Sequence, residues 1–313
     1  MASYVTGWRL PTFRHSQAAS ETALFRFAVC MRGLLAAISF VLFATTAKAQ
    51  GAQAPRADPG VTNPPSTTGS TNLTNQANNP VTALPELLVQ NYLMPAPQGS
   101  DGRLADEGLL RFYWPFMVSG VQNIFRIYQP IFTEPLFPHG RDAGLGDTTV
   151  FDLALHKVEK FTLSAGPLLV IPAASHNNMG DGKWQAGIAG GVITERSWGL
   201  LGTIITYSHS FSGYGSGRPP TQVVGVQPLA HYNFNKGYYL RSSGIWNIDY
   251  GDHTSVIPIG FGAGKVTRLR SGIVTNVYIE FQRAVHYTGT GSPIWQILTA
   301  VNFQFENYRT KPK

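Results

Sequence analysis

The chain has 313 residues, a formal net charge of +7 and one cysteine. Residues 1–49 carry five Lys or Arg side chains against one Glu, a net +4, which leaves +3 for the other residues. The basic balance therefore does not indicate a nucleic-acid partner, and a lone cysteine excludes disulfides within the chain and cysteine-based metal clusters.

An export signal is predicted at residues 31–49. An apolar stretch over residues 34–43 is followed by Ala47-Lys48-Ala49, which has the small-x-small pattern of a cleavage site. The apolar stretch is too short to remain in a bilayer as a spanning helix. We therefore predict Sec-type export with cleavage near Ala49.

The segments on both sides of this signal are predicted to contribute no fold. Residues 1–30 precede a complete signal peptide, so translation is expected to start at Met31; a long n-region is the alternative. Cleavage also removes Cys30. Residues 50–83 are rich in Pro, Asn, Thr and Gly without periodicity, which predicts a disordered periplasmic tail. The alternative for this tail is a plug that folds into a barrel lumen.

From residue 84 to residue 305 the sequence predicts about twelve β-strands. The last one, over residues 295–305, alternates with a period of two between an apolar face and a face that carries amides. Short turns and longer Gly/Pro-rich loops alternate along the whole region, as in single-chain outer-membrane barrels. The predicted fold class is all-β, an antiparallel transmembrane β-barrel of about 12 strands, with residues 306–313 as a C-terminal extension. No apolar stretch after Ala49 reaches 18 residues, so no transmembrane helix is expected.

The alternation also predicts which side chains face the lumen. A charge that faces lipid at mid-depth costs roughly 2–4 kcal/mol for Arg or Lys, so the polar side of each strand should face inward. Glu86 is a further candidate for this set. The predicted lumen-lining residues are Arg111, Tyr113, Arg126, Tyr128, Asp152, His156, His231, Tyr239, Arg241, Tyr278, Glu280 and Gln282.

Two cations do not follow this alternation. Lys265 falls on the apolar side of its strand, and a bulge near Gly262 or Gly264 would return it to the lumen. Arg283 also falls on the apolar side, where its long stem allows it to reach the headgroups.

Aromatic side chains cluster near the predicted strand ends. Membrane barrels carry such residues as girdles at the two lipid–water interfaces, and anchoring is the expected role of each one here. The predicted interface aromatics are Trp184, Trp198, Tyr232, Phe234, Tyr238, Trp246, Trp295, Phe303 and Phe305.

Several segments, in their order along the chain, resemble a family of Gram-negative outer-membrane proteins labelled as a component of the MetA pathway of phenol degradation or as a transporter. The resemblance covers about residues 84–305. It implies a twelve-stranded barrel with a transport role, and it brings no established substrate or catalytic residue. The segments that carry it are Gly144-Leu145-Gly146-Asp147, Ala165-Gly166-Pro167, Ile171-Pro172, Gly182-Lys183-Trp184-Gln185-Ala186-Gly187, Trp198-Gly199-Leu200-Leu201-Gly202, Gln227-Pro228, Tyr232-Asn233, Gly237-Tyr238-Tyr239-Leu240 and the stretch from Pro258-Ile259-Gly260 to Lys265.

Catalytic and metal sites are not indicated. Ser208-His209-Ser210 is the one cluster that suggests a lipid hydrolase, but adjacent residues of a strand point to opposite faces, and no Gly-x-Ser-x-Gly pattern is present. Pairs of His and Asp in the loops, such as His176 with Asp181, are expected to be solvated turn residues rather than metal ligands. We predict no enzyme activity, no catalytic residue, no metal and no cofactor.

The favoured function is a channel or transporter of the Gram-negative outer membrane. Small molecules, with aromatic or organic-acid solutes suggested by the family label, would pass by diffusion through a narrow polar lumen. The expected partners are the lipid bilayer, lipopolysaccharide, and the barrel-assembly machinery through the C-terminal strand, with no nucleic acid. A structural or surface-interaction barrel with a closed, salt-bridged lumen stays open as the alternative, and a lipid hydrolase is the third possibility.

Overall fold

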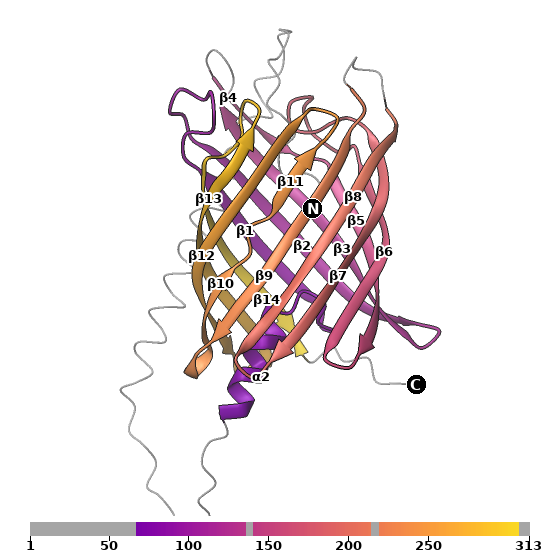
Figure 1. Cartoon of the computed structure of the whole chain (residues 1–313), viewed down its shortest axis with the longest axis vertical. Helices are drawn as coiled ribbons and strands as arrows, with labels where there is room; N and C mark the ends of the chain where they lie inside the picture. The colour runs from indigo at the N-terminus through magenta and orange to yellow at the C-terminus, as the bar shows by residue number, and fades with distance from the viewer. Residues whose placement is uncertain (1–66, 136–139, 214–218, 307–313) are drawn as a thin grey trace, which may run out of the picture.

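A closed antiparallel β-barrel forms almost all of the described structure (Figure 1). The structure is a computed structural model, and it describes residues 67–135, 140–213 and 219–306. The predicted upstream segment 1–30, the signal peptide 31–49 and residues 307–313 of the extension lie outside the described residues. These described residues form one helix and fourteen strands, together with a short 3-10 turn at Asn235–Gly237. Their bounds are α2 Thr67–Asn78, β1 Glu86–Met94, β2 Ala105–Val118, β3 Val121–Pro135, β4 Arg141–Leu145, β5 Thr148–Val158, β6 Phe161–Ile171, β7 Trp184–Arg196, β8 Gly199–Ser212, β9 Gln222–Asn233, β10 Tyr238–Ser242, β11 Trp246–Asp249, β12 Thr254–Arg268, β13 Ile273–Thr288 and β14 Trp295–Phe305.

The fourteen strands occupy twelve positions around the barrel, which we call staves, because two of these positions are each filled by two consecutive short strands. β4 and β5 both pair with β3, and β10 and β11 both lie between β9 and β12. Each further strand pairs with its neighbour in sequence, and β1 pairs with β14 to close the ring. The prediction of a twelve-stranded antiparallel barrel is therefore confirmed.

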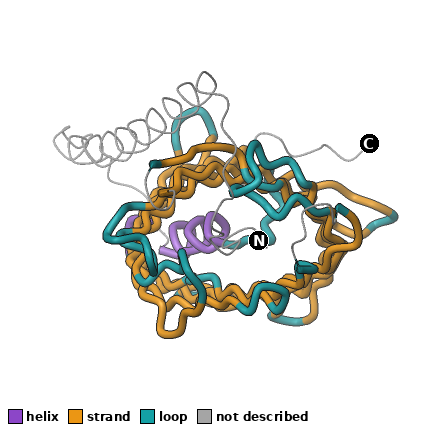
Figure 2. Tube along the Cα trace, turned by 90° about the horizontal axis from the view of Figure 1, so that it is seen from above, coloured by secondary structure: helices purple, strands orange, loops and turns teal. Residues whose placement is uncertain are grey.

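The two ends of the barrel differ in their connections. Turns of a few residues join the strands at the end where α2 lies, and the longer loops lie at the opposite end (Figure 1). We call them the short-turn end and the long-loop end. Seen along the barrel, the ring of strands is oval and α2 lies inside it (Figure 2). A helix at 67–78 differs from the predicted disordered tail, which is wrong for these residues; residues 50–66 lie outside the described part.

The outer face of the barrel is apolar, as a lipid-facing wall requires. Period-two alternation places these side chains opposite to the lumen side on every stave. No helix among the described residues is long and apolar enough to cross a membrane. Exposed examples on the outer face are Phe112, Trp114, Phe125, Leu163, Ile188, Ile205, Ile259, Phe261, Ile279, Phe281 and Val285.

Candidate functional site: the lumen and its helix

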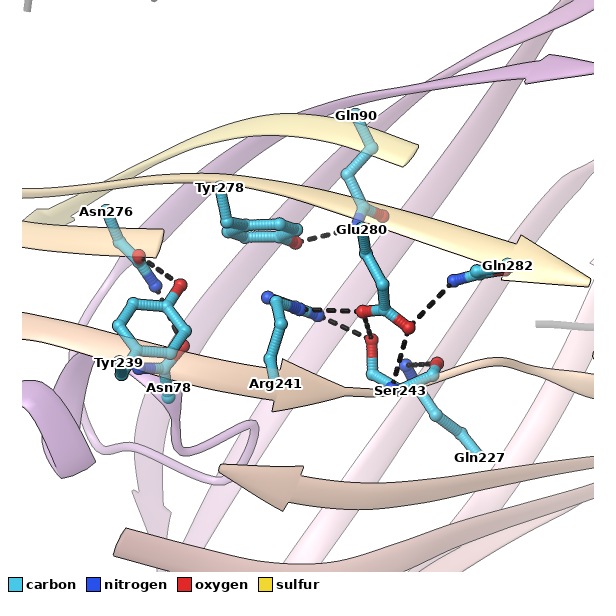
Figure 3. A network of polar contacts seen from close by, with 10 residues as sticks. All are labelled: Asn78, Gln90, Gln227, Tyr239, Arg241, Ser243, Asn276, Tyr278, Glu280 and Gln282. Atoms are coloured by element: carbon cyan, nitrogen blue, oxygen red, sulfur yellow. Dashed lines mark hydrogen bonds and ion pairs between the residues drawn. The ribbon is translucent and has the colours of Figure 1, made fainter. Parts of the chain in front are cut away.

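A buried ion pair joins β10 and β13 on the lumen side of the barrel (Figure 3). Arg241 Nε lies 2.8 Å from Glu280 Oε2, and Arg241 Nη2 donates to Ser243 Oγ at 2.6 Å. Glu280 also accepts from the Ser243 backbone N–H, the Ser243 hydroxyl and the Gln282 amide. The guanidinium stacks at 3.6 Å from the centroid of the Tyr278 ring. Because the carboxylate is hydrogen-bonded from three residues, the pair offsets the desolvation that burial imposes.

Three glycines on the inner face of β12 make room for this network. A Cβ on Gly260 would lie 2.1 Å from Glu280 Oε1, and one on Gly262 would lie 2.6 Å from Glu280 Cα. A Cβ on Gly264 would lie 2.4 Å from the Tyr239 ring. Side chains from β13 and β10 therefore lie flat across β12, which explains the glycine-rich run without the predicted bulge. The register irregularity of this strand instead falls between Ile257 and Pro258.

Arg and Tyr alternate on the inner face of β2 and β3. Arg111 lies opposite Tyr128 and Tyr113 lies opposite Arg126 in the register of the two strands. Each guanidinium lies over the ring across from it, at 4.5 Å for Arg111 over Tyr128 and 4.4 Å for Arg126 over Tyr113. Arg126 donates to the Tyr128 hydroxyl at 3.2 Å and to the backbone carbonyl of Pro80. The two strands thus hold both cations against aromatic faces.

The helix α2 and the residues that follow it are attached to the barrel wall from several sides. Neutral amides make nearly all of these bonds, and the donors and acceptors come from staves all around the ring. The bonds run from Asn75 Nδ2 to Arg196 O (2.8 Å), Asn79 Nδ2 to Glu195 Oε1 (2.6 Å), Asn233 Nδ2 to Asn75 Oδ1 (2.6 Å), Asn276 Nδ2 to Ala77 O (3.1 Å) and to Asn78 Oδ1 (3.0 Å), and Gln304 Nε2 to Gln76 O (3.4 Å). We call α2 with residues 79–81 the plug.

A small cavity lies between the plug and the lumen wall, with a volume of about 60 Å³. It is lined by Arg111, Arg126 and Arg241, together with Glu86 and His231 and several amide side chains. The volume suffices for a few waters. It is well below the 150 Å³ that holds a benzene ring in an apolar engineered cavity.

The lumen side of β5 to β9 carries more apolar side chains than the side that holds the ion pair, although polar ones such as Gln185, Ser208 and His231 lie among them. The apolar side chains are buried and form one cluster with Leu109 and Ile124, which Val81 of the plug joins. We call this surface the apolar wall, and we call the inner face of β10, β12, β13, β14 and β1 the polar wall. The apolar wall consists of Phe151, Leu153, Leu168, Val170, Ala189, Ile193, Leu200, Ile204, Val223 and Leu229.

Ten of the twelve residues predicted to line the lumen do face it. Asp152 and His156 do not, and their predicted placement is wrong. On β5 the buried parity is Thr149, Phe151 and Leu153, so Asp152 shares the outer face with Phe125, its register partner on β3. The expectation that the polar parity faces inward fails here because the apolar wall occupies the inside. The further candidate Glu86 faces the lumen and accepts from Gln304 at 2.9 Å.

The aromatic residues predicted for the membrane interface all lie on the outer face. Trp198 stacks on Tyr232, with ring centroids 6.2 Å apart. The two exceptional cations lie beside such rings: Lys265 Nζ is 4.6 Å from the Tyr238 ring centroid, and the Arg283 guanidinium is 5.2 Å from that of Trp295. Lys265 therefore stays outside, and the proposal that it returns to the lumen is wrong. The anchoring role stays a prediction.

The residues considered for a lipid hydrolase or a metal site do not lie together in the structure. Ser208 faces the lumen and donates to Gln185 at 2.9 Å, whereas His209 is exposed on the outer face, so they form no Ser–His pair. His176 lies 3.1 Å from Asp142 rather than beside Asp181. Among the described residues, no three His, Cys, Asp or Glu side chains are grouped to hold a metal ion.

A buried acid lies in the loop between β6 and β7, at the outer rim of the apolar wall. Asp181 accepts from Gln185 at 3.0 Å, and its own backbone N–H donates to Asp147 at 2.7 Å. Burial raises the pKa of Asp181 from 3.8 to about 6, and the neighbouring Asp147 adds to the rise. Lys183 opposes it.

Sequence reasoning favoured a disordered tail and kept the plug only as the alternative, and it missed the apolar wall. The segment TTGSTNLTNQAN of α2 has no apolar stripe, and its amides bond to a wall that is remote in sequence. The alternation of β5 to β9 is weak because both faces carry apolar residues. The glycines of β12 were a usable signal, since glycines two residues apart on one face of a strand indicate the close approach of other groups.

No protein-family model matches the sequence, and no curated protein is a significant match. Among solved structures, the chain is similar to an outer membrane channel from Pseudomonas putida F1, with a TM-score of 0.57 and 12% identity over 73% of this chain and 98% of that one. It also matches outer membrane phospholipase A from Escherichia coli, with a TM-score of 0.41 and 8% identity over 77% of this chain and 98% of that chain. The second likeness is too distant to support an argument. The first shows the fold: the chain is a β-barrel of the outer-membrane type.

Proposed function

We propose that the protein is an outer-membrane channel for small amphipathic molecules, which pass by diffusion once the plug leaves the lumen. The observation that carries the proposal is the way in which the plug is held. Neutral amides of Asn and Gln make most of its side-chain hydrogen bonds to the barrel wall, and each neutral bond contributes only about 0.5–1.5 kcal/mol net. A segment held this way can open locally while the barrel stays folded.

The two walls of the lumen favour a solute with an apolar body and a polar head. Aliphatic side chains from β5 to β9 face the Arg241–Glu280 network across the lumen. Aromatic or organic-acid molecules have this character, which agrees with the resemblance to proteins labelled for phenol degradation. The solved structure of similar fold is itself described as a channel, which supports the proposal.

The same proposal places the protein in the outer membrane after Sec-type export. Lipid and lipopolysaccharide would contact the apolar outer face, and β14 would be the strand recognised by the assembly machinery. The short-turn end would then be periplasmic and the plug would act at the periplasmic side.

Conductance in planar bilayers tests the channel. Protein that starts at residue 50, 67 or 82 is refolded, and folding is checked by the shift in gel mobility on heating. We expect the chain from residue 82, which lacks the plug, to conduct more than the other two, because the chain from residue 67 retains α2. Asn276→Ala, which removes two bonds to α2, should open the full-length channel more often.

A folded barrel that does not conduct even from residue 82 would overturn the proposal. It would favour the alternative, a structural barrel with a closed lumen. The buried ion pair and the small cavity are the observations that favour this alternative.

A further inference from the structure

A fully buried cation in the lumen has no anionic partner. Arg126 is 0% exposed, and it forms no ion pair with any carboxylate of the residues that the structure describes. Its guanidinium donates to the Tyr128 hydroxyl and the Pro80 carbonyl, and its Nε makes no hydrogen bond. A buried charge without a counter-ion is unfavourable, and buried cations are normally paired or bound to an anion.

Glu86 lines the same cavity but forms no ion pair with Arg126. Glu86 lies across Tyr113 in the strand register, so one strand separates it from Arg126. Its carboxylate accepts from the Gln304 amide at 2.9 Å instead. On the far side of the cavity, Glu280 is already paired with Arg241.

The cavity that Arg126 lines contains a second group without a partner. His231 is 3% exposed, and neither of its ring nitrogens makes a hydrogen bond. Buried side-chain nitrogens and oxygens are rarely left without a partner. The Gln90 Oε1 and Asn302 Oδ1 atoms that face the same cavity are also without a donor. Three arginines, an imidazole and several amides therefore line one space, together with one carboxyl group, that of Glu86.

We propose that this cavity is the head-group site for a carboxylate solute, and that the solute releases the plug by replacing the Pro80 carbonyl at Arg126. A carboxylate accepts two parallel N–H bonds from a guanidinium, whereas a backbone carbonyl offers one neutral acceptor. The carboxylate of the solute should therefore bind the Arg126 guanidinium more tightly than the Pro80 carbonyl does. The rings of Tyr113 and Tyr278, already stacked with Arg126 and Arg241, line the cavity and would contact an aromatic body.

The size of the cavity couples binding to release. At about 60 Å³ it does not hold an aromatic ring, so an aromatic carboxylate fits only if the plug moves. Pro80 lies between α2 and Val81, and Val81 packs in the apolar cluster. Loss of the Arg126 bond would thus loosen both ends of the segment 79–81. This inference rests on the proposed channel function and names the solute class and the release step.

Benzoate is the probe, with neutral benzamide as its matched control. In calorimetric titrations of the refolded protein, we expect benzoate to bind and Arg126→Gln to weaken its affinity by about tenfold or more, because a charge-assisted bidentate contact is lost. The control variant is Arg268→Gln, which removes the same charge from the pair with Glu306; the Arg268 side chain is more than half exposed. This variant should bind benzoate like the unsubstituted protein. Equal affinity in Arg126→Gln would overturn the site.

A second measurement keeps Arg126 intact, so it holds even if Arg126→Gln fails to fold. Ala77→Cys, in the protein that starts at residue 50 and therefore lacks Cys30, places the only thiol on the buried side of the plug. Benzoate should raise its labelling rate by about tenfold or more if the plug is released, and benzamide should not. A rate that benzoate leaves unchanged would overturn the release step. Absence of conductance in the chain from residue 82, with benzoate binding retained, would refute the channel and not this site.

Discussion

The two walls of the lumen are built on opposite principles. The polar wall carries the Arg241–Glu280 pair, whose carboxylate accepts hydrogen bonds from three residues. On its inner face β12 has glycines at this level, which leaves room for side chains of the neighbouring strands to lie across it. The apolar wall from β5 to β9 instead presents close-packed aliphatic residues such as Leu153 and Ile204. One barrel interior therefore combines a hydrogen-bonded network with what resembles the core of a soluble protein.

The difference shows that an inner face need not be hydrophilic in a barrel of twelve strands. Where a lumen holds water, polar residues indicate the inside. Where side chains and a plug occupy it, burial selects apolar residues inside as well as outside. The plug contacts both walls, through Asn276 on one and Val81 on the other.

The largest expected effect is at the buried pair of the polar wall. Glu280→Ala leaves the Arg241 guanidinium buried without its carboxylate, which should lower the free energy of unfolding by about 3–5 kcal/mol. Urea titration of protein refolded into vesicles measures this. The control Glu306→Ala breaks the pair with exposed Arg268 and should change stability by no more than about 1 kcal/mol. Equal losses in the two variants would mean that the polar wall contributes no more than a surface pair.

This contrast also marks how far the sequence could predict the molecule. The alternation of residues 295–305 and the alternating loop lengths predicted twelve staves, because closure of a barrel repeats one local rule. On the polar wall the same rule placed Arg241 and Glu280 correctly, since their strands have one clearly apolar face. It misplaced Asp152 and His156, because which face of β5 turns toward the lumen depends on packing against staves that are distant in sequence. It favoured disorder over a plug for the segment that contains α2, because nothing local indicates that its amides have partners more than a hundred residues away.

A pH dependence is expected at the outer rim of the apolar wall. Asp181 has a pKa of about 6 in the folded protein against 3.8 ordinarily, so the folded state binds the proton more tightly. Its contribution is therefore most favourable below about pH 4 and is lost as the pH rises through about 6, a change of roughly 3 kcal/mol at most. Hydrogen-exchange protection factors of residues 173–182, which are corrected for the intrinsic exchange rate at each pH, should be higher at pH 4.5 than at pH 7. Asp181→Asn should remove most of this difference; an unchanged pH dependence in that variant would assign the effect to another group.

The glycines of β12 provide a test of the polar wall that involves no charge. A Cβ on Gly262 would lie 2.2 Å from the Ile279 carbonyl oxygen, so Gly262→Ala must push β12 and β13 apart. We expect a loss of about 1–3 kcal/mol in the free energy of unfolding. The matched control is Gly190→Ala on the outer face of β7, where the nearest atom lies at 3.0 Å and an open apolar groove of about 470 Å³ adjoins the residue. A control loss as large as that of Gly262→Ala would mean that β12 has no special need for glycine.

The smallest effect decides which way the apolar wall faces. Asp152 lies on the outer face beside Phe125, and its Oδ1 makes no hydrogen bond. An acid that faces lipid is unfavourable by less than the roughly 2–4 kcal/mol of a cation, so Asp152→Ala should raise the free energy of unfolding by about 1–2 kcal/mol. Asp152→Asn keeps the shape and removes the charge, and it should recover part of that gain. If both variants instead destabilise the barrel, Asp152 belongs to a polar lumen network and the apolar wall faces outward. The wall that looks like a protein core would then be a lipid-facing surface, and the comparison of the two walls would fail.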